Sequence, residues 1–283
     1  MNGSDEQAVQ AAPRKHWTLD DVNWAAFDRS KVSDGLVKAV KAAAMVEFNA
    51  PDYVTYLCNV FADREDIKDT IRQWGAEEVQ HGQALRRWAE LADPAFDFDA
   101  SFAAFREGYG IPVDAIESVR GSRAGELIAR CVVETGTSSF YTAIKEGTDE
   151  PVLKELASRI AADEFRHYKL FFEKFEELGE EMPRARRAMV ALGRLKEADD
   201  DELAYAYYAA NELGGDKPYS RKECARAYEL SALTLYRRRH FDRVVAMVAK
   251  AIGVRPHSAI MSGISGFAWQ LFRARLYFMQ RAA

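Results

Sequence analysis

The segment WGAEEVQHG, residues 74–82, carries a glutamate and a histidine three residues apart, Glu78 and His81. The same spacing returns further along the chain in Glu164 and His167. On a helix, residues three apart share a face, so each pair presents a carboxylate and an imidazole to one point. Both pairs fall on apolar stripes with helical periodicity, where a buried charge is costly unless it is paired or bound to a metal.

Two further glutamates complete the pattern. Helical periodicity predicts four long helices, over 33–61, 64–92, 122–146 and 151–179. Glu47 and Glu134 lie in the middle of the first and third of these helices, again on the apolar face. The order along the chain is therefore Glu, Glu-x-x-His, Glu, Glu-x-x-His, which is the ligand pattern of di-iron carboxylate bundles.

The loops predict how these helices are connected. Short turns join the first helix to the second and the third to the fourth, whereas 94–121 is a long connection. Two hairpins joined by one long crossover are typical of ferritin-like four-helix bundles. We therefore predict an all-α protein with a ferritin-like bundle over 31–183. A lead-in over 1–30 and a helical extension over 184–283, packed on the bundle, complete the expected domain organisation.

Local signals predict where helices bend and end. Pro51 lies inside the first helix and is expected to kink it. Asp63 is expected to cap the second helix, and Pro94 to stop it. Gly136, in mid-helix beside Glu134, is expected to mark a local bulge. Beyond the bundle, helices are expected over 184–197, 201–213, 220–250 and 257–281.

The charge balance of the predicted core favours a metal centre. Four ionised carboxylates in one core would repel each other strongly, and two divalent cations would neutralise them. A mixture of carboxylate and imidazole ligands suits Fe, Mn or Zn better than Mg. The alternative is that all four apolar stripes are misread and these residues lie on solvated faces.

The residues around the four glutamates carry a resemblance to a known family. The relevant segments are Glu47-x-x-x-Pro51-x-Tyr53, WGAEEVQHG at 74–82, Glu134-Thr-Gly-Thr137 and ADEFRH at 162–167. Over roughly residues 35–180 the chain resembles the soluble acyl-carrier-protein desaturases, within the ferritin-like di-iron carboxylate superfamily. The resemblance does not extend beyond about Met182.

The resemblance implies a centre of two irons, with a Mn/Fe pair as the other option, in which two glutamates bridge the metals. Glu78 and Glu164 would bridge, Glu47 and His81 would complete one iron, and Glu134 and His167 would complete the other. Thr137 would face the oxygen-binding side and relay a proton, unless it is a packing hydroxyl bonded to the preceding turn. Ligand histidines usually donate their second N–H to a carboxylate, so Asp163 and Glu77 are candidate partners, or else surface charges.

The function implied by the resemblance is an O2-activating oxidoreductase. It would desaturate or hydroxylate an acyl chain or similar apolar substrate, free or carrier-bound, in a tunnel lined by the four helices and ending near Thr137. A ferredoxin-like protein would supply electrons, and a homodimer is common in the family. The alternative is ferritin- or rubrerythrin-like iron oxidation or peroxide scavenging without an organic substrate. Against it, the sequence has no CxxC pair, and storage ferritins are much shorter.

Composition limits the remaining function classes. The 44 acidic residues outnumber the 39 basic ones, and a net charge of −5 argues against a dedicated nucleic-acid binder. The three cysteines are widely spaced and form neither a disulfide framework nor a thiolate zinc site. No secretory signal and no apolar run long enough for a transmembrane span are recognised, so a cytoplasmic protein is expected.

Overall fold

The computed structural model describes residues 16–196, 201–215, 218–256 and 258–281. Every regular element in these ranges is a helix, and no strand occurs among them. The all-α prediction is therefore confirmed for the described part of the chain. Residues 1–15 of the expected lead-in lie outside the described residues.

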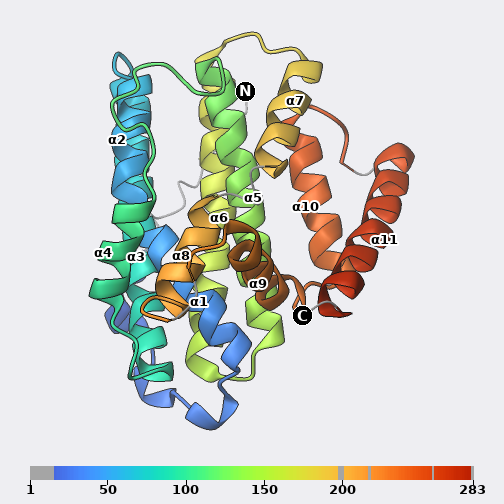
Figure 1. Cartoon of the computed structure of the whole chain (residues 1–283). Helices are drawn as coiled ribbons and strands as arrows, with labels where there is room; N and C mark the ends of the chain where they lie inside the picture. The colour runs from blue at the N-terminus through green and yellow to red at the C-terminus, as the bar shows by residue number, and fades with distance from the viewer. Residues whose placement is uncertain (1–15, 197–200, 216–217, 257, 282–283) are drawn as a thin grey trace, which may run out of the picture.

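Four long helices lie side by side at the centre of the molecule (Figure 1). They are α1 (Asp34–Phe48), α3 (Glu65–Ala92), α5 (Arg123–Gly147) and α6 (Pro151–Leu178). α1 packs on α3, α5 packs on α6, and α3 also contacts α6. The long connection between α3 and α5 contains α4 (Phe98–Gly108). This loop order is the predicted one, while membership of the ferritin-like class stays a prediction.

Local capping explains where α5 and α6 begin and end. The Ser122 hydroxyl accepts the Gly125 N–H at 3.1 Å at the start of α5. α6 begins with Pro151 in its first turn, where the missing N–H costs nothing, and the Glu150 carboxylate accepts the next two N–H groups. Gly179 ends α6 with a φ of 67°, a left-handed conformation that favours glycine.

The predicted helix over 33–61 is divided rather than kinked. α1 ends at Phe48, and α2 (Ala50–Val60) begins after Asn49. Pro51 lies in the first turn of α2, because proline cannot supply an interior N–H but suits a helix start. The expected Asp63 cap is also wrong: Arg64 is the residue before α3, and the Asp63 carboxylate pairs with Arg123.

Two further expectations differ from the structure. The expected helix over 220–250 is divided into α9 (Arg221–Leu233) and α10 (Arg238–Ala251). The His240 Nδ1 atom accepts the Arg237 N–H at 3.1 Å, which fixes a new helix start there. The bulge expected at Gly136 is absent, and α5 is regular from end to end.

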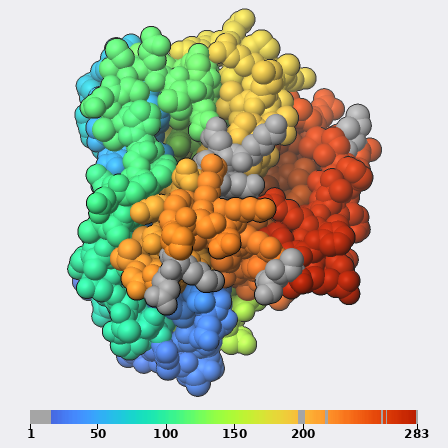
Figure 2. Space-filling model, viewed as in Figure 1, coloured from blue at the N-terminus to red at the C-terminus, as the bar shows by residue number. Residues whose placement is uncertain are grey.

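The helices beyond the bundle cover α1 and α5. Besides α9 and α10, they are α7 (Arg184–Lys196), α8 (Asp201–Asn211) and α11 (Ala259–Arg281). α8 and α9 pack on α1, α7 and α10 pack on α5, and α11 packs on α9 and α10. Figure 2 shows the orange residues of this region lying between the green and blue part of the surface and the red C-terminal helices. Within the described residues, no helix has both the length and the apolar character to cross a membrane.

The apolar core forms two clusters along the bundle. One contains Trp88, Ile144 and Leu153, and the other contains Ile71 and Phe171. Complete burial of each such side chain contributes about 1.5–3 kcal/mol. Along α3, α5 and α6, the buried glutamates Glu78, Glu134 and Glu164 follow residues of one cluster and precede residues of the other. The burial of these apolar side chains therefore offsets the cost of burying the charged ones.

Candidate metal centre

The six predicted ligands come together in the interior of the bundle, and none is more than 7% exposed. They form two overlapping groups whose potential ligand atoms lie within 4.8 Å of one another: Glu47, Glu78, His81 and Glu164 in one, and Glu78, Glu134, Glu164 and His167 in the other. The two residues common to both groups are the two glutamates expected to bridge.

A close approach of two helices brings Glu47 to the other ligands. Gly82, next to His81 on α3, lies directly against α1. A Cβ atom at Gly82 would lie 2.6 Å from the backbone nitrogen of Phe48, which is closer than real contacts allow. Only glycine therefore permits this packing, and Phe48 is the residue after Glu47.

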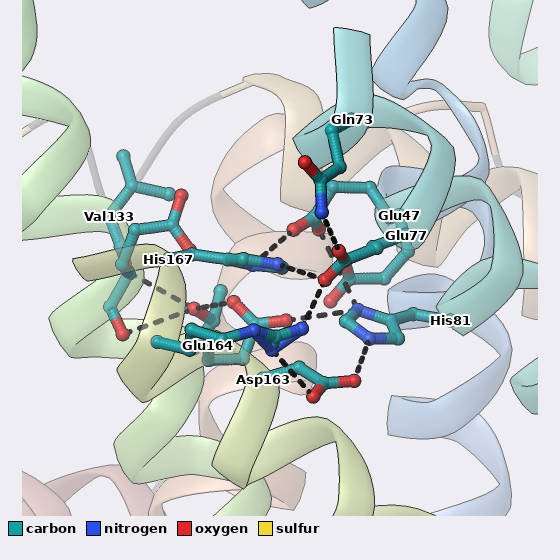
Figure 3. Close-up of polar contacts among 12 residues, drawn as sticks. Glu47, Gln73, Glu77, His81, Val133, Asp163, Glu164 and His167 are labelled. Atoms are coloured by element: carbon teal, nitrogen blue, oxygen red, sulfur yellow. Dashed lines mark hydrogen bonds and ion pairs between the residues drawn. The ribbon is translucent and has the colours of Figure 1, made fainter. Parts of the chain in front are cut away.

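The inward nitrogens of both histidines face the carboxylates (Figure 3). The His81 Nδ1 atom is 3.1 Å from Oε1 of Glu164 and 3.9 Å from Oε2 of Glu78. The His167 Nδ1 atom is 2.9 Å from Oε1 of Glu78 and 3.7 Å from Oε2 of Glu134. Each imidazole thus aims the same ring nitrogen at the centre of the cluster.

The donor atoms of this cluster fit a pair of divalent cations. Among the described residues, eleven buried side-chain polar atoms make no hydrogen bond, and five of them belong to this cluster: Glu78 Oε1, His81 Nδ1, Glu134 Oε2, Glu164 Oε1 and His167 Nδ1. Buried polar atoms are almost always hydrogen-bonded, and here five of the exceptions converge on one place. Oxygen and imidazole nitrogen donors in this mixture suit Fe, Mn or Zn.

The pKa values of the buried groups also indicate an uncompensated negative charge in the cluster. Burial, together with the nearby Glu78 and Glu164 carboxylates, raises the pKa of Glu47 well above its ordinary value. Burial alone would lower the pKa of His81, but the adjacent Asp163 and Glu164 carboxylates raise it to about 9. Without metal, the cluster therefore holds protons where cations would otherwise balance the charge.

The outer nitrogens of the histidines contact carboxylates on the opposite helix. The His81 Nε2 atom on α3 lies 3.1 Å from Oδ2 of Asp163 on α6. The His167 Nε2 atom on α6 lies 2.9 Å from Oε2 of Glu77 on α3. These crosswise pairs match the two predicted partners, and they fix each ring so that Nδ1 faces inward.

Sequence reasoning missed two residues that hold this outer layer. Arg166 bonds both outer carboxylates, with Nη1 at 2.9 Å from Asp163 Oδ1 and Nη2 on Glu77. The Trp17 indole N–H donates to Asp163 at 2.7 Å, and its ring stacks on His81 with centroids 6.0 Å apart. Trp17 lies 146 residues from Asp163, and no local pattern signals such a contact.

Two hydroxyl groups on α5 bond the inner carboxylates. The Thr137 hydroxyl donates to Oε2 of Glu164 at 2.6 Å, and it also lies 3.3 Å from the backbone oxygen of Glu134. Thr137 thus contacts both a ligand candidate and the preceding turn. The Tyr141 hydroxyl donates to Oε1 of Glu47 at 2.5 Å, a contact that sequence reasoning missed because a tyrosine on an apolar stripe usually belongs to the core.

A mostly apolar cavity of about 310 Å³ opens on the cluster. Four glutamates of the cluster and Thr137 form one wall, and Gly136 adjoins them. The cavity is also lined by residues from α7, α8 and α9, namely Leu195, Leu203 and Leu233. Bundle helices line the cavity beside Thr137, as expected, and the extension contributes further lining residues.

Comparisons with known proteins assign no family. No protein-family model matches the chain, and no curated protein matches it.

Proposed function

We propose that the protein is an O2-activating di-iron oxidoreductase that desaturates or hydroxylates an apolar substrate. The observation that carries this proposal is a shared wall: the metal-donor cluster and Thr137 line the same mostly apolar cavity. A substrate in that cavity would lie beside the metals without any further opening of the fold.

The chemistry belongs to a pair of ferrous ions, which, when bound, would supply electrons to O2 for attack on an unactivated C–H bond. Either reaction would consume one O2, two electrons and two protons from outside, while the substrate gives up two electrons. Hydroxylation would leave one oxygen atom in the product and one in water. Desaturation would release both oxygen atoms as water. A ferredoxin-like protein is the proposed electron donor.

The residues of the chain have distinct tasks in this proposal. The six donors would hold the metals, and Asp163 and Glu77 would keep the histidine rings in the ligating orientation. Thr137, on the cavity side, would hold a proton at Oγ1 and pass it on during turnover. The apolar cavity wall would bind the substrate body and exclude water.

The cavity also favours substrate oxidation over iron storage or peroxide scavenging. Ligand pockets for organic molecules are mostly apolar with a few polar groups, as this one is. Hydrated ferrous ions on their way to a storage core gain nothing from an apolar wall, because desolvating a charge there is costly.

Anaerobic titration with Fe(II), followed by O2, tests the proposal. We expect about two irons per chain and oxidation that stops at that stoichiometry. Glu78→Ala and His167→Ala should lose the iron. Glu146→Gln, at a carboxylate that pairs with Arg239 and His240 instead, is the matched control and should retain it. Oxidation of many irons per chain would establish the storage alternative, and fewer than two in the unmodified chain would overturn the centre.

A further inference from the structure

The cavity wall that carries the metal donors also carries a buried cation. Arg130, Glu134, Thr137 and Tyr141 recur at helical spacing on one face of α5, and all four line the cavity. Arg130 is only 5% exposed. Arginine is almost never buried in this way unless it is paired with an opposite charge.

The partners of Arg130 within the protein are weak. Its Nε atom makes no hydrogen bond and lies 3.9 Å from Oε1 of Glu126, at the outer limit of an ion pair. The other Glu126 oxygen already accepts hydrogen bonds from Tyr56 at 2.7 Å and Ser118 at 2.8 Å. The guanidinium carbon also lies 4.9 Å from the centre of the Tyr53 ring, which holds it by a cation–π contact.

Other charged groups that line the cavity have partners of their own. Glu202 accepts a hydrogen bond from the Tyr53 hydroxyl at 2.7 Å. Glu229 pairs with Arg275 at 2.6 Å. Arg194 contributes a second guanidinium to the lining. Among these residues, Arg130 combines burial, a position on the metal-donor face of α5 and a donor atom without a hydrogen bond.

We infer that Arg130 binds the carboxylate of the substrate, so that the substrate is a free carboxylic acid with an apolar body rather than a carrier-bound acyl group. Oxidation of this acid rests on the proposed function. Binding of its carboxylate to Arg130 does not. A planar guanidinium pairs with a carboxylate through two parallel hydrogen bonds, and burial strengthens the pair because water competes less.

The position of Arg130 also sets which part of the substrate meets the metals. Thr137 lies seven positions after Arg130, which is about 10 Å along a helix. An extended chain with its carboxylate at Arg130 therefore presents carbons several bonds away from the carboxylate to Thr137 and the metal donors. The cavity of about 310 Å³ has room for the apolar body of such a chain.

Calorimetric binding of decanoate, decan-1-ol and methyl decanoate to the full chain under anaerobic conditions, with and without Fe(II), tests the inference. We expect decanoate to bind at least about tenfold more tightly than the alcohol and the ester. Arg130→Gln should remove that advantage, and Arg130→Lys should retain part of it. Arg239→Gln, which changes an exposed arginine that pairs with Glu146, should have no effect.

A second variant covers the case in which Arg130→Gln does not fold. Glu126→Gln keeps Arg130 and removes its competing negative charge, so decanoate should bind several-fold more tightly. A purely structural role of the Arg130–Glu126 pair predicts no such gain. Equal affinity for the three probes, tighter binding of the ester, or decanoate binding that needs Fe(II) but not Arg130 would overturn the inference. Failure of the oxygen reaction alone would overturn only the proposed function.

Discussion

At the scale of single residues, the outer carboxylates fix the orientation of the two histidine rings. Asp163 and Glu77 each immediately precede a bridging candidate and contact the histidine of the opposite helix. Arg166 joins the two carboxylates and holds them in place. This arrangement couples the two Glu-x-x-His segments, so loss of one carboxylate should disturb both metal positions.

Replacing Asp163 by Asn or Glu77 by Gln should lower iron affinity by about 10- to 100-fold, because the ligand imidazole loses its orienting acceptor. Competition with a coloured chelator measures the affinity. Asp69→Asn, on the exposed side of α3, is the matched control, since its side chain is 74% exposed. Affinities indistinguishable from the control would show that these carboxylates do not support the ligands.

Thr137 offers a second test at the same scale. Thr137→Val removes the hydroxyl that donates to Glu164 but keeps the shape, so iron content should stay at about two per chain. Substrate oxidation should fall by about a hundredfold if the hydroxyl carries a proton, and Thr137→Ser should restore most of it. Product analysis by mass spectrometry measures the rate. Full activity of the Val variant would establish the packing role instead.

At the scale of helices, two glycines differ in the space that surrounds them. Gly82 allows α3 to touch the backbone of α1, whereas a Cβ at Gly136 on α5 would meet no atom within 4 Å. The first glycine is required by packing, and the second leaves open space beside the cavity. The same substitution should therefore have opposite effects at the two positions.

Gly82→Ala should destabilise the metal-free protein by about 1–3 kcal/mol, because α1 and α3 must move apart. Gly136→Ala should stabilise it by up to about 1 kcal/mol, because alanine favours the helical state more than glycine does. Chemical denaturation monitored by circular dichroism gives both free energies of unfolding. Equal effects of the two substitutions would contradict the close approach at Gly82.

Most of these helices could be predicted from the sequence, because their signals are local. Pro151 and Gly179 at the ends of α6 are examples, and so is the stripe that carries Glu164. The break after Phe48 could not be told from a kink, since Pro51 allows either outcome. The start of α10 depends on His240, which contacts Glu146 from a distant helix.

At the scale of the whole molecule, the extension closes the site. α7, α8 and α9 contribute Leu195, Leu203 and Leu233 to the lining of the cavity that the four glutamates also line. The six ligand candidates could be predicted because their spacing repeats along the chain. The cavity wall and the Trp17 contact could not, because they join segments whose proximity arises only in the folded chain.

Leu233→Trp should fill the cavity from α9 and abolish decanoate binding, while leaving about two irons per chain. Leu192→Trp on the exposed side of α7 is the control, because that leucine is 60% exposed. Calorimetry and iron analysis of both variants measure the two quantities. Unchanged decanoate binding in the Leu233 variant would contradict a substrate site between the bundle and the extension.

The central claim is that two metals share Glu78 and Glu164, and X-ray absorption at the iron edge of the Fe(II)-loaded chain tests it most directly. We predict oxygen and nitrogen neighbours only, together with an iron–iron distance of about 3.5–4 Å, as in other two-metal sites. A spectrum without an iron–iron distance, or with a sulfur neighbour, would contradict the claim.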